Sequence, residues 1–123
     1  MGSDDLEARY LDAEQIAQKF AIALAGHNFE TARDFLSASL QEKYDVVTLK
    51  KHFLGMAESY SSRKADAVAD PIRIVEVEDL EEEGDYGALY VPISSQDWNE
   101  AVTVTVGDYG EGVRIRELEW GRP

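Results

Sequence analysis

The feature that most constrains the fold is a change in the spacing of apolar residues about halfway along the chain. Up to about Tyr60 apolar side chains recur every three or four positions, as on one face of a helix, and from Ile72 they alternate, as in a strand with one buried face. Each kind of element must bury its apolar face against another element. The sequence therefore predicts a single α+β domain over residues 1–123, with N-terminal helices packed into a curved antiparallel β-meander.

The most apolar helix is predicted near the N-terminus. Asp12 can cap a helix over residues 13–25, and residues 1–11 are then expected to form a partly ordered extension. The stretch Phe20–Ala25 is apolar on nearly every side, so this helix should lie inside the domain with contacts on several faces. Gly26 follows where a left-handed residue often ends a helix.

Two shorter helices are predicted to follow. Asn28 can cap one over residues 29–36, whose apolar side chains fall on one side. Thr48 can cap another that fades near Tyr60, after a loop over residues 41–47. Period-two patterning then predicts four strands, at residues 72–77, 86–93, 100–106 and 113–120.

The last predicted strand contains a break in its alternation. Val113 and Ile115 share one face, but the next apolar residues, Leu118 and Trp120, fall out of phase with them. One extra residue in the strand would return all four side chains to the same face. We therefore predict a β-bulge near Arg116-Glu117.

The composition excludes several classes of site. The chain has no cysteine, which rules out thiol nucleophiles and Cys-ligated metals, and its net charge of −13 opposes binding to nucleic-acid phosphates. The longest apolar run is far shorter than the roughly 20 residues of a membrane span. The N-terminus lacks the basic and apolar regions of a signal peptide. We expect a cytoplasmic protein with no metal, cofactor, nucleic acid or membrane partner.

The negative charge is concentrated in the second half. Residues 1–65 carry a net charge of −2 and residues 66–123 a net charge of −11. The densest stretch is predicted to form a solvated hairpin or a surface for a basic protein partner, since its spacing gives little support to an EF-hand calcium loop. Its carboxylates are Glu76, Glu78, Asp79, Glu81, Glu82, Glu83 and Asp85.

The order of these parts resembles the nuclear transport factor two-like superfamily. The resemblance rests on Ala13–Leu40 with its Gly26-His27-Asn28 break, on Thr48–Met56, and on Asn99–Trp120 with its Val-Arg-Ile-Arg-Glu-Leu-Glu-Trp ending. It implies a cystatin-like cone, in which a curved antiparallel sheet wraps around a long N-terminal helix. The superfamily includes isomerases such as ketosteroid isomerase, dehydratases, polyketide cyclases, small-molecule binders and immunity-type proteins, so the fold alone does not select a function.

The enzymes of that superfamily generally place a carboxylate, or a carboxylate and a histidine, inside the cone, and no such pair can be matched in this chain. His27, beside the helix stop, and His52, on a helix flank, are the two histidines that could act as a base. Asp34 and Asp45 are the carboxylates nearest to apolar helical segments, although a solvated helix residue and a loop residue are the simpler interpretations. Trp98, in a polar turn, is expected to pack on a neighbour or line a pocket mouth.

The second face of the predicted sheet combines Tyr, Ala and Thr, which is typical neither of a core nor of a fully solvated surface. It is either an ordinary exposed face or the interface of a homodimer. The residues assigned to that interface are Tyr86, Tyr90, Thr103 and Thr105.

Three functions remain open from the sequence. The first is a noncatalytic binding or protein-interaction module that presents an acidic surface to a basic partner. The second is a small cone-pocket enzyme of the isomerase, dehydratase or hydrolase type, and the third is a sensor of a small apolar ligand. We assign no catalytic residues, because no carboxylate or histidine has a sequence context that would shift its pKa toward catalysis.

Overall fold

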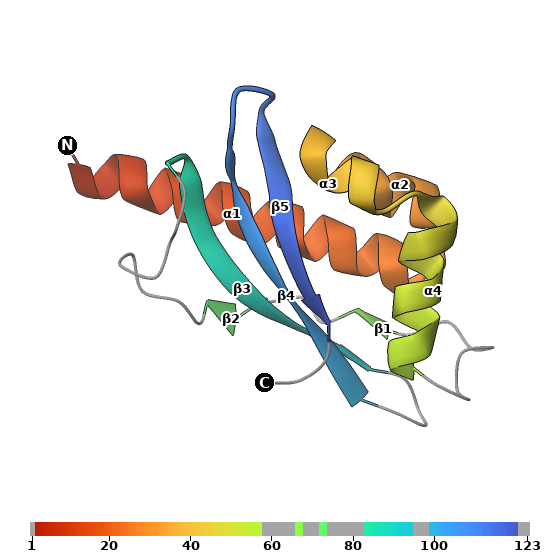
Figure 1. Ribbon diagram of the computed structural model, residues 1–123. Helices are drawn as coiled ribbons and strands as arrows, with labels where there is room; N and C mark the ends of the chain where they lie inside the picture. Colours follow the sequence, from red (N-terminus) through yellow and green to blue (C-terminus); the bar gives the residue numbers. More distant parts are fainter. Residues whose placement is uncertain (1, 58–65, 68–71, 74–82, 95–98, 121–123) are drawn as a thin grey trace.

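The computed structural model describes residues 2–57, 66–67, 72–73, 83–94 and 99–120, and it shows an α+β fold. Helices come first and an open antiparallel sheet follows, with three long strands (Figure 1). The described helices are α1 (Gly2–Ala25), α2 (Phe29–Asp34), α3 (Ala38–Lys43) and α4 (Val46–Ala57). The described strands are β1 (Asp66–Ala67), β2 (Ile72–Arg73), β3 (Asp85–Ser94), β4 (Asn99–Asp108) and β5 (Val113–Trp120).

The sheet is antiparallel throughout. β4 lies between β3 and β5, while the short strands β1 and β2 both pair with the other side of β3. Among the described residues β5 is therefore an edge strand, and on its outer side Leu36, between α2 and α3, forms a parallel bridge with Ile115. The predicted meander is confirmed for β3, β4 and β5.

Helix α1 lies across one face of the sheet (Figure 1). Small side chains face the strands, and Ala13, Ala17 and Ala21 are fully buried. They let the helix approach β3 closely: the Tyr10 ring lies 3.7 Å from the position that a Cβ on Gly87 would take. Larger fully buried side chains fill the rest of the core, among them Phe20, Leu24, Phe53, Leu89, Val91, Val104 and Ile115.

Both ends of α1 differ from the prediction. The helix begins at Gly2, so residues 2–11 are its first turns, and Asp12 is an exposed residue within the helix rather than its cap. At the other end the left-handed residue is His27, with φ 61°, and not Gly26. The Asn28 N–H bonds the Ala23 carbonyl at 2.8 Å and the His27 N–H bonds the Leu24 carbonyl at 3.0 Å, which is the Schellman pattern of helix termination.

The short helix α3 was not predicted, and it occupies part of the expected loop. The buried Ser37 caps it, because its hydroxyl accepts a bond from the Leu40 N–H at 3.2 Å. Its C-terminal carbonyls are held by Arg33, whose guanidinium donates to Gln41 O and Tyr44 O at 3.0 and 2.9 Å. These polar contacts define a helix that contributes a single apolar residue, Leu40, to the core.

Helix α4 starts three residues earlier than expected, and its cap is Asp45 rather than Thr48. The Asp45 carboxylate accepts a hydrogen bond from the Thr48 N–H at 2.7 Å, and this bond is the largest cause of a pKa below the ordinary value of 3.8. Asp45 is thus an exposed loop residue, as the simpler interpretation expected, and it also caps α4. None of the helices in the described part is long and apolar enough to cross a membrane.

The cap at Asp45 gives a prediction about pH. A lowered carboxyl pKa stabilises the fold above 3.8, and this stabilisation is lost as the pH falls through the lower folded value. Asp45→Ala should therefore lower the thermal midpoint at pH 7, and its difference from the wild type should shrink below pH 3.8. Asp45→Asn keeps a capping oxygen at every pH and serves as the control. Equal midpoints for Asp45→Ala and the wild type at pH 7 would refute the assignment.

The predicted bulge in β5 is confirmed. Thr105 pairs with Glu117 and Val106 pairs with Ile115, so one extra residue, Arg116, lies on the β5 side of the ladder. Leu118 then returns to the face of Ile115, next to the core. The chain also has a second bulge that the sequence did not predict: Asp85 pairs with Gly107 and Gly87 with Val106, which leaves Tyr86 as the extra residue in β3.

Candidate functional site

The most distinctive polar group in the described part of the chain is an ion pair between Asp85 on β3 and Arg116 on β5. The guanidinium holds both carboxylate oxygens, with Nε to Oδ1 and Nη2 to Oδ2 each at 2.8 Å. The Asp85 side chain is 0% exposed and that of Arg116 is 15% exposed. Such bidentate, shielded pairs are stronger and more directional than surface ion pairs.

The two bulges explain how residues on strands that do not touch one another come together. Without the bulge at Tyr86, strand alternation would turn Asp85 to the same face as Gly87, toward α1. With it, Asp85 is paired with Gly107 on the opposite face of the sheet. Arg116 lies in the facing bulge of β5, so its side chain reaches across β4 to Asp85.

The close packing of the start of β3 and of Tyr109 around β4 requires a glycine at position 107. A Cβ added to Gly107 would collide with the carbonyl oxygen of Gly84, would lie 2.6 Å from the Tyr109 hydroxyl, and would lie 2.8 Å from the Asp85 Cα. Two of these neighbours are backbone atoms that cannot move aside alone. The absence of a side chain at Gly107 thus leaves the space that Gly84, Asp85 and Tyr109 occupy.

Tyr109 completes the cluster from the turn between β4 and β5. Its hydroxyl donates to Asp85 Oδ1 at 2.5 Å. Burial, followed by the hydrogen bond to Asp85, raises the pKa of Tyr109 well above its ordinary value of 10. Tyr109 therefore stays protonated and remains a donor, and Asp85 accepts hydrogen bonds from two groups of Arg116 and from Tyr109.

This arrangement is typical of an ion pair that stabilises the fold, and not of a carboxylate that acts as an acid or base in catalysis. A general base must present an accessible lone pair to the proton that it removes. The Asp85 carboxylate is fully buried and both of its oxygens already accept from strong donors. We call Asp85, Tyr109 and Arg116 the carboxylate cluster.

The sequence placed Asp85 in an exposed acidic surface, which is wrong for this residue. The structure brings it together with Arg116, 31 positions further along the chain. The nearest signal was the predicted bulge, because bulges often redirect a side chain toward a particular partner. It identified Arg116, but nothing in the sequence around Asp85 distinguished it from its acidic neighbours.

The two histidines lie in separate aromatic clusters on the helices. His27 is half-buried rather than solvated: it stacks on Phe29 at 5.6 Å between ring centroids and meets the edge of Phe53 at 6.0 Å. His52 is exposed and stacks on Trp120 at 5.8 Å. Asp34 is exposed at the end of α2, as the simpler interpretation expected.

Most of the predicted acidic stretch, and Trp98, lie outside the described residues. Within them, Glu83 is exposed in the turn before β3. That turn lies against the turn after β4, because the Asp108 N–H donates to Gly84 O at 3.0 Å. Asp108 and Glu111, both exposed, therefore lie at the same end of the sheet as Glu83.

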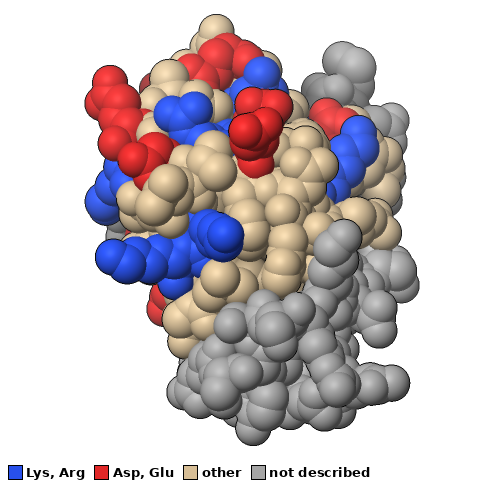
Figure 2. Space-filling view, turned by 90° about the vertical axis from the view of Figure 1, so that its right-hand side faces the viewer, with Lys and Arg blue, Asp and Glu red and all other residues tan. Residues whose placement is uncertain are grey.

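The side of the molecule formed by the short helices has a different charge pattern. Figure 2 shows this side, where basic and acidic side chains are interspersed around an uncharged centre. The exposed lysines Lys43, Lys50 and Lys51 belong to α3 and α4. The Ala38 N–H at the start of α3 donates to Glu111 at 2.7 Å, so this side of mixed charge borders the exposed carboxylates of the β4–β5 turn.

The face proposed for a dimer is partly as predicted. Tyr90 lies directly opposite Thr103, and Ala88 lies opposite Thr105, so these residues share one face of the sheet, and Tyr90, Thr103 and Thr105 are half-buried. Tyr86 does not belong with them. The β3 bulge turns it toward the core, where Arg9 of α1 lies over its ring at 5.6 Å.

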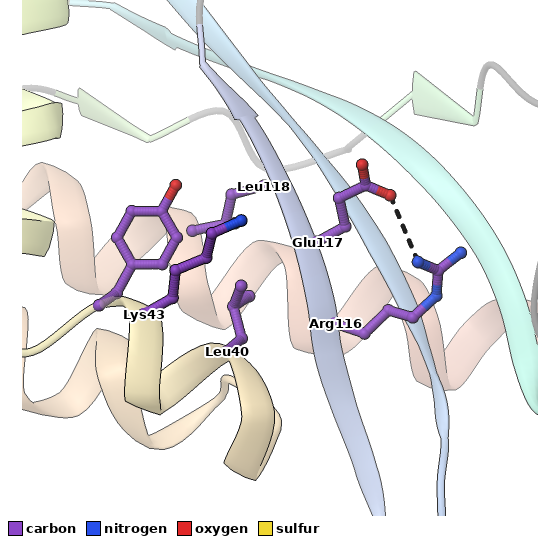
Figure 3. Close-up of a pocket in the computed structure, with 6 residues that line it drawn as sticks. Leu40, Lys43, Arg116, Glu117 and Leu118 are labelled. Atoms are coloured by element: carbon purple, nitrogen blue, oxygen red, sulfur yellow. Dashed lines mark hydrogen bonds and ion pairs between the residues drawn. The ribbon is translucent and has the colours of Figure 1, made fainter.

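An open cleft of about 290 Å³ separates α3 from the edge of β5. Leu40, Lys43 and Tyr44 form one wall, and Arg116, Glu117 and Leu118 form the other. In Figure 3 Leu40 and Lys43 lie on the side of Leu118, whereas Arg116 points away from α3 and bonds Glu117 at 3.3 Å. A smaller hollow of about 160 Å³ lies nearby, between the start of α3 and Tyr109.

The described residues contain no group of three or more acidic or histidine side chains arranged to hold a metal ion. Comparison with known proteins gives no further assignment: no protein-family model matches the chain, and no curated protein or solved structure is significantly similar to it.

Proposed function

We propose that the chain is a noncatalytic protein-interaction module whose acidic surface recognises a basic partner. The observation that carries this proposal is the closed state of the carboxylate cluster. Asp85, a buried carboxylate with a tyrosine partner, has the composition of a catalytic site, but Arg116 and Tyr109 occupy its oxygens. The cluster therefore stabilises the fold, and we assign partner recognition to the protein surface instead.

The charge distribution supports an acidic binding surface. The second half of the chain holds a net charge of −11, and the turns at Gly84 and Asp108 gather further exposed carboxylates at one end of the sheet. Like charges held together raise a negative potential that reaches about one Debye length, roughly 8 Å at physiological salt. A partner drawn by this potential must be basic.

The element order also supports the proposed cystatin-like cone and kinship with the nuclear transport factor two-like superfamily. A long first helix packed beneath an antiparallel sheet is the arrangement expected of that fold. In the competing proposal of a cone-pocket enzyme, a solvent-accessible carboxylate must line the pocket. The carboxylate of Asp85 does not meet that requirement.

The proposal predicts an effect of surface charge on association rate. Replacing Glu81, Glu82 and Glu83 with Gln should slow binding to the partner, with a smaller change in dissociation, because steering acts mainly on encounter. The partner is captured from lysate on the immobilised wild type, purified, and followed by surface kinetics at about 50 and 150 mM KCl, where the higher salt should also slow association.

A matched variant separates local from total charge. Glu30→Gln, Asp34→Asn and Glu42→Gln remove the same charge from exposed positions on α2 and α3, and their association rate should stay near that of the wild type. Equal association by both triple variants, or the capture of no partner by the wild type, would contradict the proposed function.

We also propose a homodimer through the sheet face that bears Tyr90, Thr103 and Thr105. Thr103→Lys with Thr105→Lys should dissociate it, because the interface would then bury unpaired charge. Light scattering on the wild type should give twice 13.7 kDa. Thr31→Lys with Ser39→Lys adds the same charge at exposed helical positions and should remain dimeric. A wild type of 13.7 kDa at all micromolar concentrations would exclude the dimer.

A further inference from the structure

The edge of β5 has backbone groups that the described structure leaves open to a further strand. Ile115 directs its N–H and C=O away from β4, since they bond Phe35 O and Ser37 N at 2.8 and 2.7 Å. In an antiparallel ladder such outward residues alternate with inward ones. Counting through the pairs Thr105 to Glu117 and Val104 to Leu118, the next outward residue is Leu118.

Leu118 lies beside the cleft and has no strand partner on its outer side within the described residues. None of the hydrogen bonds formed between described residues uses its outward N–H or C=O. Its side chain lies across the cleft from Leu40 (Figure 3), and Tyr44 also lines this cleft. The cleft thus combines an open main-chain donor and acceptor with an apolar wall, the two features needed for binding a peptide as an added strand.

The charges of the residues beside Leu118 indicate which kind of strand would bind at this edge. Glu117, whose side chain is 59% exposed, and Glu119, also exposed, flank Leu118 and lie on the opposite face of the strand. A second copy of β5 centred on Leu118 would place Glu117 opposite Glu119, which is a repulsive cross-strand pair. A peptide with basic residues at those positions would instead form attractive pairs.

We propose that the edge of β5 at Leu118 binds an extended peptide of a partner protein, in which an apolar residue is flanked on both sides by Lys or Arg. The apolar side chain lies against Leu40, Leu118 and Tyr44, while its basic neighbours lie beside Glu117 and Glu119. On the far wall, Lys43 is placed to donate to a carbonyl of the bound peptide. This strand-adding site goes beyond the acidic surface described above and does not include it.

The test uses the unaltered protein and a defined probe, an acetylated Lys-Val-Lys-Val-Lys amide. Titration followed by backbone amide NMR should shift the resonances of Leu118, Leu40 and Lys43, and hydrogen exchange at the Leu118 amide should slow by about tenfold or more, as a new hydrogen bond requires. The same peptide with both valine amides N-methylated keeps its charge but loses its strand donors, and it should bind at least about tenfold more weakly.

Two results would overturn the proposal. One is equal binding of the methylated and unmethylated peptides, which would mean that attraction is purely electrostatic. The other is an unchanged Leu118 amide at saturation. Glu117→Gln with Glu119→Gln should weaken binding of the peptide. Replacing Glu81, Glu82 and Glu83 with Gln should instead leave the dissociation constant of the peptide within about twofold of the wild-type value. This last comparison keeps failure of the edge site distinct from failure of the acidic surface.

Discussion

Arg116→Met is expected to destabilise the domain by about 3–5 kcal/mol, because it leaves the Asp85 carboxylate buried without its counter-ion. Both oxygens of Asp85 lose a donor at once, and the side chain is 0% exposed, so water cannot replace the guanidinium without local opening. A loss of that size is a large part of the 5–15 kcal/mol that holds a typical domain folded. Urea unfolding followed by circular dichroism measures it.

Two controls separate the buried charge from the loss of a long side chain. Arg114→Met removes a nearby arginine on the same strand, one whose guanidinium bonds only the adjacent Val113 carbonyl among the contacts described, and should change stability by less than about 0.5 kcal/mol. Adding Asp85→Asn to Arg116→Met removes the stranded charge while keeping an acceptor for Tyr109, and should recover most of the loss. A cost below about 1 kcal/mol for Arg116→Met alone would show that water reaches the carboxylate.

Gly107→Ala is expected to cost about 3 kcal/mol, at the upper end of what overpacking costs. The added methyl group would meet the Gly84 carbonyl and the Asp85 Cα, which are fixed by the pairing of β3 with β4, as well as the Tyr109 hydroxyl. The variant should also weaken the hydrogen bond from Tyr109 to Asp85. Near-ultraviolet circular dichroism and urea unfolding report the two effects.

The same substitution at Gly55 is the matched control. Gly55 lies in α4, and an added Cβ has no atom within 4 Å. Alanine there should raise stability by up to about 1 kcal/mol, because it lowers the entropy lost on forming a helix. If Gly107→Ala and Gly55→Ala changed the free energy of unfolding by the same amount, the close contacts around Gly107 would be contradicted.

The sequence predicted elements wherever apolar side chains recur in a regular pattern. The bulge in β5 was found because Leu118 and Trp120 break the alternation set by Val113 and Ile115. The bulge in β3 gave no such signal, because it falls between Asp85 and Gly87, and a glycine has no side chain to show which face it occupies. Helix α3 was missed for a similar reason: its one core residue, Leu40, shows no period.

The candidate site was harder to predict because it depends on contacts across the sheet. Asp85 ends a run of carboxylates that look alike in sequence, and only its pairing with Gly107 turns it toward Arg116. The end of α1 shows the same limit on a smaller scale. Gly26 has the residue type for a left-handed turn, yet the left-handed residue is His27, whose ring packs against Phe29 and Phe53.

The most direct measurement compares partner binding by two variants that alter different carboxylates. One carries Asp85→Asn with Arg116→Met, which removes the buried ion pair, and the other carries Gln in place of Glu81, Glu82 and Glu83, which removes surface charge. If recognition belongs to the acidic surface, the first variant, once shown to be folded, should capture the partner as the wild type does, and the second should associate more slowly. Loss of capture by the folded first variant, with full capture by the second, would contradict the proposed function and place recognition at the carboxylate cluster.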